Sequence, residues 1–110
     1  MQYMAQKQSY GGRFPGAEHS IIELAGDRVG RLLIDRHENN IHLIDIAILR
    51  ASRGRGIGGF ILEKLKAESE TVSLMVFTTN HGAIRLYRRQ GFTIVNDTGS
   101  YLEMEWKNAR

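Results

Sequence analysis

The stretch that decides the fold reads Arg53-Gly54-Arg55-Gly56-Ile57-Gly58-Gly59, between an apolar segment, Ile41 to Leu49, and an amphipathic one, Ile57 to Glu68. This order predicts a strand, a glycine-rich turn and a helix. The first N–H groups of a helix have no partner inside it, and the helix dipole adds partial positive charge at that end. Glycine has no side chain, which lets an anion approach the backbone. The stretch therefore predicts a pyrophosphate site.

Three interpretations of this turn are open from its letters alone. The spacing Gly54-x-Gly56-x-x-Gly59 matches a dinucleotide fingerprint, which needs a carboxylate at the end of the next strand. The segment 72–77 is that strand, and Thr78, Thr79 and Asn80 follow it without a carboxylate. A Walker A site needs a Lys-Ser/Thr pair after the glycines, which is absent. The third interpretation is a glycine-rich turn without a ligand.

A second motif lies in the later half of the chain. Residues 80–92 have the form N-x-x-A-x-x-L-Y-x-x-x-G-F, beginning at Asn80 and ending at Phe92. Together with R-x-x-G-x-G at 53–58, this pattern resembles the GNAT superfamily of acetyl-CoA-dependent N-acetyltransferases. The two motifs stand in the family's order, with one helix and one strand between them. The resemblance covers roughly Ser20 to Trp106 and implies acetyl-CoA as co-substrate.

Composition limits the class of protein. The chain has 110 residues, 42% hydrophobic and 25% charged, which is typical of one soluble globular domain over 1–110. It has no apolar run of membrane-spanning length and no signal peptide, so we expect a cytoplasmic protein without a membrane partner. The absence of cysteine excludes disulfides and a cysteine nucleophile. The net charge of +3 is scattered, and no basic face with interleaved aromatic residues indicates nucleic acid.

The periodicity predicts an α+β fold, which the resemblance makes GNAT-like: a mixed, mostly antiparallel sheet flanked by helices and short at its N-terminus. We expect the helix after the turn to carry Ile57, Phe60, Ile61 and Leu65 on one face, and the second helix to end at Gly91. Strands are expected at 19–25, 29–36, 41–49, 72–77, 92–95 and 101–106, the first three as an antiparallel meander.

The N-terminus departs from the family pattern. Met1 to Tyr10 is predicted to form a short helix and Gly11 to Gly16 a loop. GNAT proteins begin with a strand and a helix that find no match here. We therefore expect an exposed sheet edge, a missing wall of the acceptor site and a homodimer that covers the edge.

The resemblance also implies which residues hold the co-substrate. Backbone N–H groups of the glycine-rich turn would bind the pyrophosphate, with the two arginines adding charge, and the end of the preceding strand would pair with the pantetheine arm. That pairing needs a backbone splayed from its neighbour. The side chain of Asn80 would hold the cofactor or the backbone, or would simply cap the following helix. The implied set is Ile46, Ala47, Ile48, Arg53, Gly54, Arg55, Gly56, Ile57, Gly58, Gly59 and Asn80.

Two residues are candidates for catalysis. Tyr87 matches the family's tyrosine general acid, and its hydroxyl, with an ordinary pKa near 10, is comparable in acidity to a coenzyme A thiol. The alternative is a helix tyrosine with its hydroxyl at the surface. His42 stands roughly where some members of the family carry a glutamate that acts as general base. A histidine side chain titrates near neutral pH and could take this role. The alternative is an ordinary strand histidine, with a water chain in place of a base.

The other titratable residues have simpler expected roles. Alternation puts Asp45 on the opposite face of its strand from His42 and Ile46, where we expect it to pair with backbone or with an arginine. The remaining histidines show no metal-ligand spacing, so no metal is expected.

The sequence thus predicts an N-acetyltransferase. The acetyl group would pass from acetyl-CoA to a primary amine of an unknown small-molecule or peptide acceptor by direct attack. The alternative is a non-catalytic acyl-CoA-binding module with the same fold.

Overall fold

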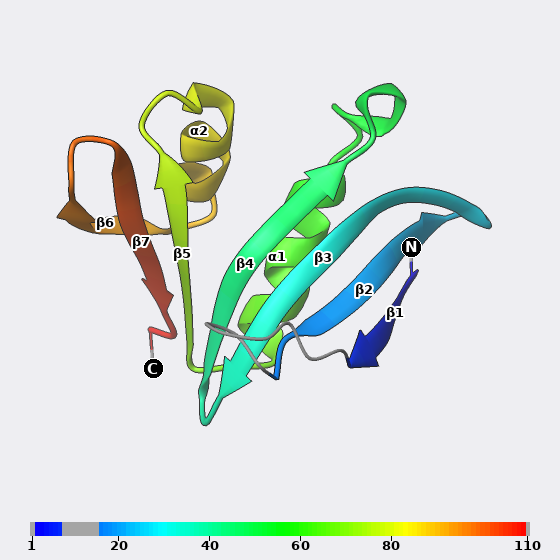
Figure 1. Cartoon of the computed structure of the whole chain (residues 1–110), viewed down its shortest axis with the longest axis horizontal. Helices are drawn as coiled ribbons and strands as arrows, with labels where there is room; N and C mark the ends of the chain where they lie inside the picture. Colours follow the sequence, from blue (N-terminus) through cyan, green and yellow to red (C-terminus); the bar gives the residue numbers. More distant parts are fainter. Residues whose placement is uncertain (1, 8–15, 110) are drawn as a thin grey trace.

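The chain folds around one mixed sheet. In the computed structural model, residues 2–7, as backbone, and residues 16–109 are described (Figure 1). The elements follow in the order β1 (Gln2–Lys7), β2 (Glu18–Leu24), β3 (Asp27–His37), β4 (Asn40–Ile48), the 3₁₀ helix η1 (Arg50–Ser52), α1 (Ile57–Ala67), β5 (Thr71–Phe77), α2 (His81–Arg89), β6 (Thr93–Asp97) and β7 (Tyr101–Lys107).

The seven strands lie in the order β1-β2-β3-β4-β5-β7-β6. All neighbours pair antiparallel except β4 and β5, which are parallel and joined by α1. Parallel neighbours need such a crossover because the chain must return to the same end of the sheet. The predicted α+β fold with a mostly antiparallel sheet, including the meander of β2, β3 and β4, is confirmed.

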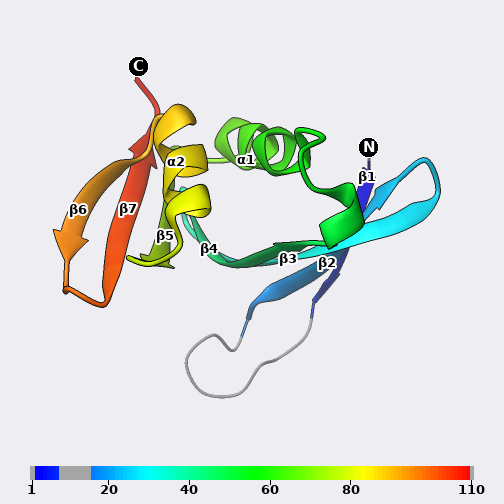
Figure 2. The same cartoon turned by 90° about the horizontal axis from the view of Figure 1, so that it is seen from above.

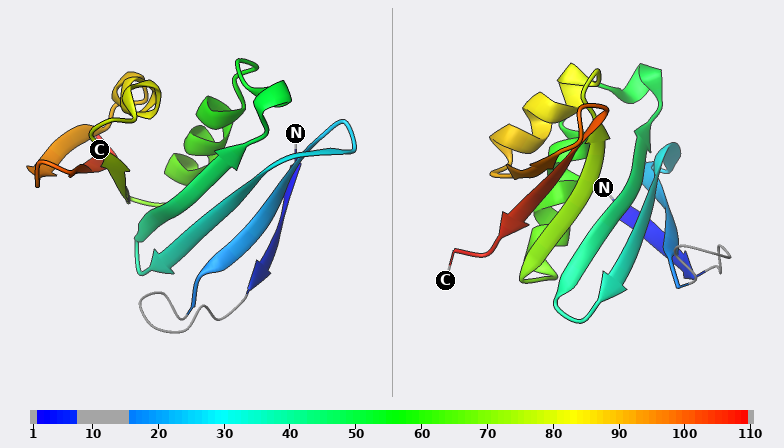
Figure 3. Two further views of the ribbon diagram at one scale, coloured as in Figure 1. Left: turned by 45° about the horizontal axis from the view of Figure 1, so that its top comes forward. Right: turned by 60° about the vertical axis from the view of Figure 1, so that its left-hand side comes forward.

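Both α-helices cover the same face of the sheet (Figures 2 and 3). Ile57, Ile61 and Leu65 of α1 are buried in one core with the inner face of the sheet, as predicted. Phe60 was expected on the same face but is 40% exposed, and Leu62 is buried instead. Within the described residues no helix lies on the opposite face, which is turned forward in the right panel of Figure 3.

The sheet splits between β4 and β5. These strands pair over only four positions, from Asn40 opposite Thr71 to Leu43 opposite Leu74. Beyond Leu43, β4 follows β3, whereas β5 follows β7 to its last residue. The backbones of the two strand ends therefore diverge in a V, as Figure 1 shows, and the space between these backbones is called the opening below.

A β-bulge in β4 marks the closed end of this opening. Ile34 pairs with Leu43 but Leu33 pairs with Asp45, which leaves Ile44 as an extra residue. The bulge resets the alternation, so Ile46 packs against the same core as Leu43. The expectations that Ile46 shares a face with His42 and that Asp45 lies on the opposite face from His42 are therefore both wrong.

The N-terminal segment differs from its prediction. Gln2–Lys7 is a strand paired antiparallel with β2, so the expected helix over Met1 to Tyr10 is wrong, and so is the expectation of a missing first strand. β1 forms because the outer edge of β2 carries backbone N–H and C=O groups with which residues 2–7 can pair. The local strand propensity of these residues does not reveal that pairing. Residue 1 and residues 8–15, with most of the predicted loop, lie outside the described residues.

Candidate active site

The end of β4 is tied to the turn that follows it. Leu49 N–H donates to the Val29 carbonyl at 2.8 Å. Arg53 Nε donates to the Ile48 carbonyl at 3.1 Å, so this arginine secures the strand end in addition to adding positive charge. No sequence pattern signals this contact, because it depends on how η1 folds back.

The glycine-rich turn leads directly into α1. Gly54 and Gly56 have φ of 80° and 77°, the left-handed region that glycine adopts without strain. Gly56 is the N-cap and offers no side-chain acceptor, and the first turn has no acidic residue. Phe60 N–H donates to the Gly56 carbonyl, so the N–H groups of 57–59 precede the first bond within the helix. These groups and the helix dipole favour an anion at this end.

The last two glycines of the motif serve helix packing. A Cβ built at Gly58 would lie 3.0 Å from Leu86 Cδ2, and one at Gly59 would lie 3.3 Å from Gln90 Nε2. Both neighbours belong to α2 or its C-cap. The pattern of four glycines thus combines two backbone requirements with two close helix–helix contacts, whereas the sequence motif predicts ligand approach alone.

Asn80 caps α2. Its Oδ1 accepts from the Ala83 N–H at 3.3 Å, and this confirms the capping interpretation. A contact of Asn80 with the co-substrate stays a prediction.

Tyr87 of α2 is 7% exposed and packs at 5.7 Å from the ring of Phe92. The buried ring fits both a general acid and the alternative of a helix tyrosine whose hydroxyl reaches the surface, and the general-acid role stays a prediction. Burial raises the pKa of the Tyr87 hydroxyl above its ordinary 10.0, and the carboxylate of Asp45 raises it further. The hydroxyl therefore stays protonated at neutral pH, as a proton donor must.

Asp45 follows the bulge in β4. Its Oδ2 accepts from Arg31 Nε at 3.1 Å, which confirms the expected pairing with an arginine. The carboxylate is 43% exposed and still acts on Tyr87.

His42 lies at the closed end of the opening. Its Nδ1 is 2.9 Å from Ser73 Oγ across the parallel strand pair. Ser73 Oγ also accepts from Asn40 Nδ2 at 3.4 Å. His42 alternates with the buried Ile41 and so faces away from the helices, whereas Tyr87 comes from the helix side. The structure therefore does not bring the two catalytic candidates together on one face.

Residues 2–7 and 16–109 carry neither a metal-binding cluster nor a membrane-spanning helix. No group of three or more His, Asp or Glu side chains is arranged to hold a metal ion. No helix in this part of the chain has both the length and the apolar character that crossing a membrane requires.

Comparison with known proteins gives a family match. The family described as "Acetyltransferase (GNAT) domain" matches residues 15–94. Among solved structures, the PaiA N-acetyltransferase from Thermoplasma acidophilum in complex with coenzyme A has a TM-score of 0.74 at 20% identity, covering 84% of this chain and 61% of that one. PH1933 from Pyrococcus horikoshii has a TM-score of 0.70 at 21% identity, covering 84% and 66%.

A third structure matches over almost its whole length. A GNAT family acetyltransferase from Elizabethkingia anophelis with acetyl-CoA bound has a TM-score of 0.72 at 13% identity, covering 96% of this chain and 98% of that one. The chain thus spans under two thirds of the length of the first two relatives and nearly all of the third. At these identities the likeness establishes the shared fold.

Proposed function

The chain belongs to the GNAT acetyltransferase family, and we propose that it transfers an acetyl group from acetyl-CoA to a primary amine by direct attack on the thioester. The divergence of β4 from β5 carries this proposal, because the diverging end of β4 leads through the glycine-rich turn to the free N-terminus of α1. The presence of coenzyme A and acetyl-CoA in two of the matched structures supports the choice of co-substrate.

The opening suits an elongated thioester. From Ile46 to Ile48, β4 pairs with β3 on one side and has no pairing with β5 on the other. Apart from the Ile48 carbonyl, which accepts from Arg53, this backbone edge would pair with the amide groups of the pantetheine arm as an added strand does. The pyrophosphate would then reach the N–H groups of 54–59, with Arg53 and Arg55 nearby.

In the transfer step the amine nitrogen forms a bond to the acetyl carbon and the carbon–sulfur bond breaks. A backbone N–H of β4 would stabilise the oxyanion. The Tyr87 hydroxyl would give its proton to the leaving thiolate; its raised pKa keeps that proton in place until the transfer but makes it a weaker acid than an ordinary tyrosine. His42 would take the proton lost by the amine through water, with Ser73 fixing its ring.

Calorimetric titration of acetyl-CoA into the protein, with NADH as control, tests the binding half of the proposal. We expect saturable heat with acetyl-CoA alone. Thiol release from acetyl-CoA in the presence of a panel of primary amines then tests the transfer. Binding without amine-dependent thiol release would contradict the proposed reaction.

The second candidate is a non-catalytic acyl-CoA-binding module. One observation favours this candidate. His42 and Tyr87 approach from opposite faces of the sheet, so the two proposed catalytic groups do not share one face. The same thiol-release assay separates the two functions. For either function we propose a cytoplasmic homodimer, and sedimentation equilibrium tests its oligomeric state.

A further inference from the structure

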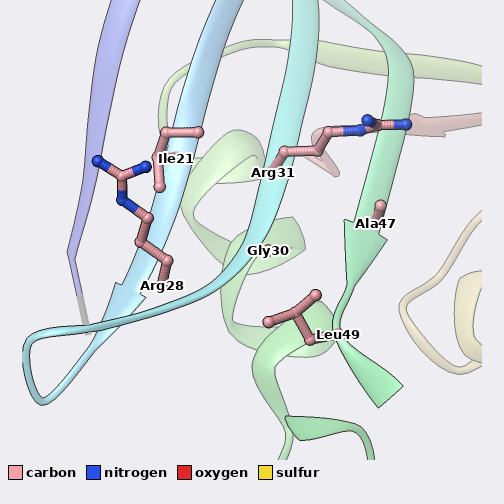
Figure 4. A pocket seen from close by; sticks show the side chains of 6 residues that line it. All are labelled: Ile21, Arg28, Gly30, Arg31, Ala47 and Leu49. Carbon is pink, nitrogen blue, oxygen red and sulfur yellow. The ribbon is translucent and has the colours of Figure 1, made fainter. Parts of the chain in front are cut away.

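A hollow lies on the face of the sheet opposite the helices. It has a volume of about 240 Å³ and is bounded by β2, β3 and the end of β4 (Figure 4). This is smaller than the cavities that hold drug-sized ligands and suits one short apolar segment. The residues that line it are Ile21, Arg28, Gly30, Arg31, Ala47 and Leu49.

The hollow exists because the residues at its centre are small. Gly30 has no side chain, and a Cβ there would lie only 2.3 Å from the Ala47 carbonyl oxygen, so the backbone contact demands glycine. The methyl group of Ala47 fills little of the space beside it. Ile21 and Leu49 supply apolar walls, and Leu49 is 57% exposed although it is large and hydrophobic. An apolar group bound here would cover this surface.

Two guanidinium groups border the apolar floor. Arg31 uses Nε to bind Asp45, which leaves its Nη donors for another acceptor. Arg28 forms no ion pair within residues 16–109, although Glu23 is its register partner on β2. Figure 4 shows both arginines at the hollow, with Arg31 extending from β3 across β4. The border therefore favours a carboxylate.

The hollow adjoins the proposed reaction site. Ala47 lies between Ile46 and Ile48, the residues whose free backbone edge would hold the pantetheine arm. Asp45 follows the bulge at the closed end of the opening, and its carboxylate accepts from Arg31, which lines the hollow. An ammonium group drawn to Asp45 would thus stand at the opening while the rest of its molecule lay over the hollow.

We propose that this hollow is the acceptor subsite and that it selects amines carrying an apolar segment that ends in a carboxylate. The proposal rests on the acetyltransferase function proposed above. The amine would lie near Asp45, the apolar segment over Ala47 and Ile21, and the carboxylate at Arg28. The path from β4 to β2 crosses two strand spacings, about 10 Å, which an eight-carbon chain spans.

The kinetic test compares three amines of one chain length: 8-aminooctanoate, octylamine and 1,8-diaminooctane. We expect kcat/KM to be about fivefold higher for 8-aminooctanoate than for octylamine, which is the effect of one exposed ion pair between its carboxylate and Arg28. We expect the lowest kcat/KM for the diamine, because its second ammonium group would lie beside that arginine. Arg28→Ala should abolish this preference and Arg28→Lys should keep part of it. Arg85→Ala, which removes an exposed arginine of α2, is the matched control and should preserve the preference. Equal preference in wild type and Arg28→Ala overturns the proposal.

A binding test separates this proposal from the proposed function. Octanoate is titrated without acetyl-CoA, and the methyl resonances of Ile21, Ala47 and Leu49 are followed by NMR. We expect these signals to shift, with an affinity that Arg28→Ala lowers about fivefold and that added salt weakens. Shifts elsewhere, or an unchanged affinity in Arg28→Ala, overturn the site. Octanoate binding without any thiol release would support the anion site and overturn the acetyl transfer, and with it the acceptor role.

Discussion

At the scale of single residues, Gly30 shows how closely β3 and β4 approach. A Cβ at this position would lie 2.3 Å from a backbone oxygen, which cannot move without separating the strands. We expect Gly30→Ala to lower the free energy of unfolding by about 2 kcal/mol, as other overpacked sites do. Urea denaturation measures this loss. Gly16→Ala is the control, because a Cβ at Gly16 meets nothing within 4 Å, and equal stabilities for the two variants would refute the argument.

Tyr87 carries the proposed proton transfer. Tyr87→Phe keeps the ring that packs on Phe92 and removes only the hydroxyl. We expect turnover to fall about a hundredfold, as when a general acid is lost, with nearly unchanged affinity for acetyl-CoA. Steady-state thiol release and calorimetry measure the two effects. Wild-type turnover in the variant would remove Tyr87 from the mechanism.

The raised pKa of Tyr87 also predicts a dependence of stability on pH. Above about pH 10.0 the unfolded tyrosine has lost its proton while the folded one retains it, so the folded state binds more protons. The free energy of unfolding should therefore fall with rising pH in this range, and less steeply in Tyr87→Phe. Urea titrations between pH 9 and 11 compare the two proteins, with Tyr101→Phe as control. Identical slopes in wild type and Tyr87→Phe would show that burial does not hold this proton.

At the scale of elements, the start of α1 depends on the conformation of Gly56. A Cβ at Gly56 would meet no atom within 4 Å, so the difficulty for a larger residue is its φ of 77°. Valine avoids this region, and we expect Gly56→Val to shift the helix start and weaken acetyl-CoA binding about tenfold. Asparagine tolerates it, so Gly56→Asn should bind nearly as wild type. Calorimetry decides, and equal binding by both variants would contradict this account.

Elements with strong local signals were predictable from the sequence. The alternation of apolar residues predicts the bounds of β3, and the apolar run predicts those of β5, each to within two residues. Gly91, with φ of 90°, ends α2 as predicted. Two features had no local signal. The bulge at Ile44 arises from the register of β4 on β3, and β1 forms because β2 presents a pairing edge.

The candidate site was predictable only in part. The two motifs located the turn, the strand end and Tyr87, because each is contiguous in sequence. The relation of His42 to Tyr87 was not predictable, since it depends on which face of the sheet each side chain takes after folding. For Asp45 the sequence predicts an arginine partner without saying which one. The partner is Arg31 because of the register between β3 and β4, which local sequence does not reveal.

At the scale of the whole molecule, acetyl-CoA would bridge two half-sheets. β1 to β4 form one and β5 to β7 the other, joined by four pairs and the helices. A ligand that binds only the folded state at one hundred times its Kd adds about 2.7 kcal/mol, which should raise Tm by about 10 °C. Thermal denaturation with and without acetyl-CoA measures the shift. NADH is the control, and an equal shift with NADH would contradict specific bridging.

The short join between β4 and β5 also has a consequence for folding kinetics. Each antiparallel hairpin closes a short loop, whereas Asn40 and Thr71, the first parallel pair, lie 31 positions apart. Long loops cost more entropy to close, and contacts between distant residues form slowly. The meander can therefore assemble before β5 docks beside it. Even β5 and β7 can first meet at Phe77 and Tyr101, 24 positions apart, so the pairing with the longest loop to close is the one that creates the opening for acetyl-CoA. The co-substrate then meets a binding site only after that loop has closed.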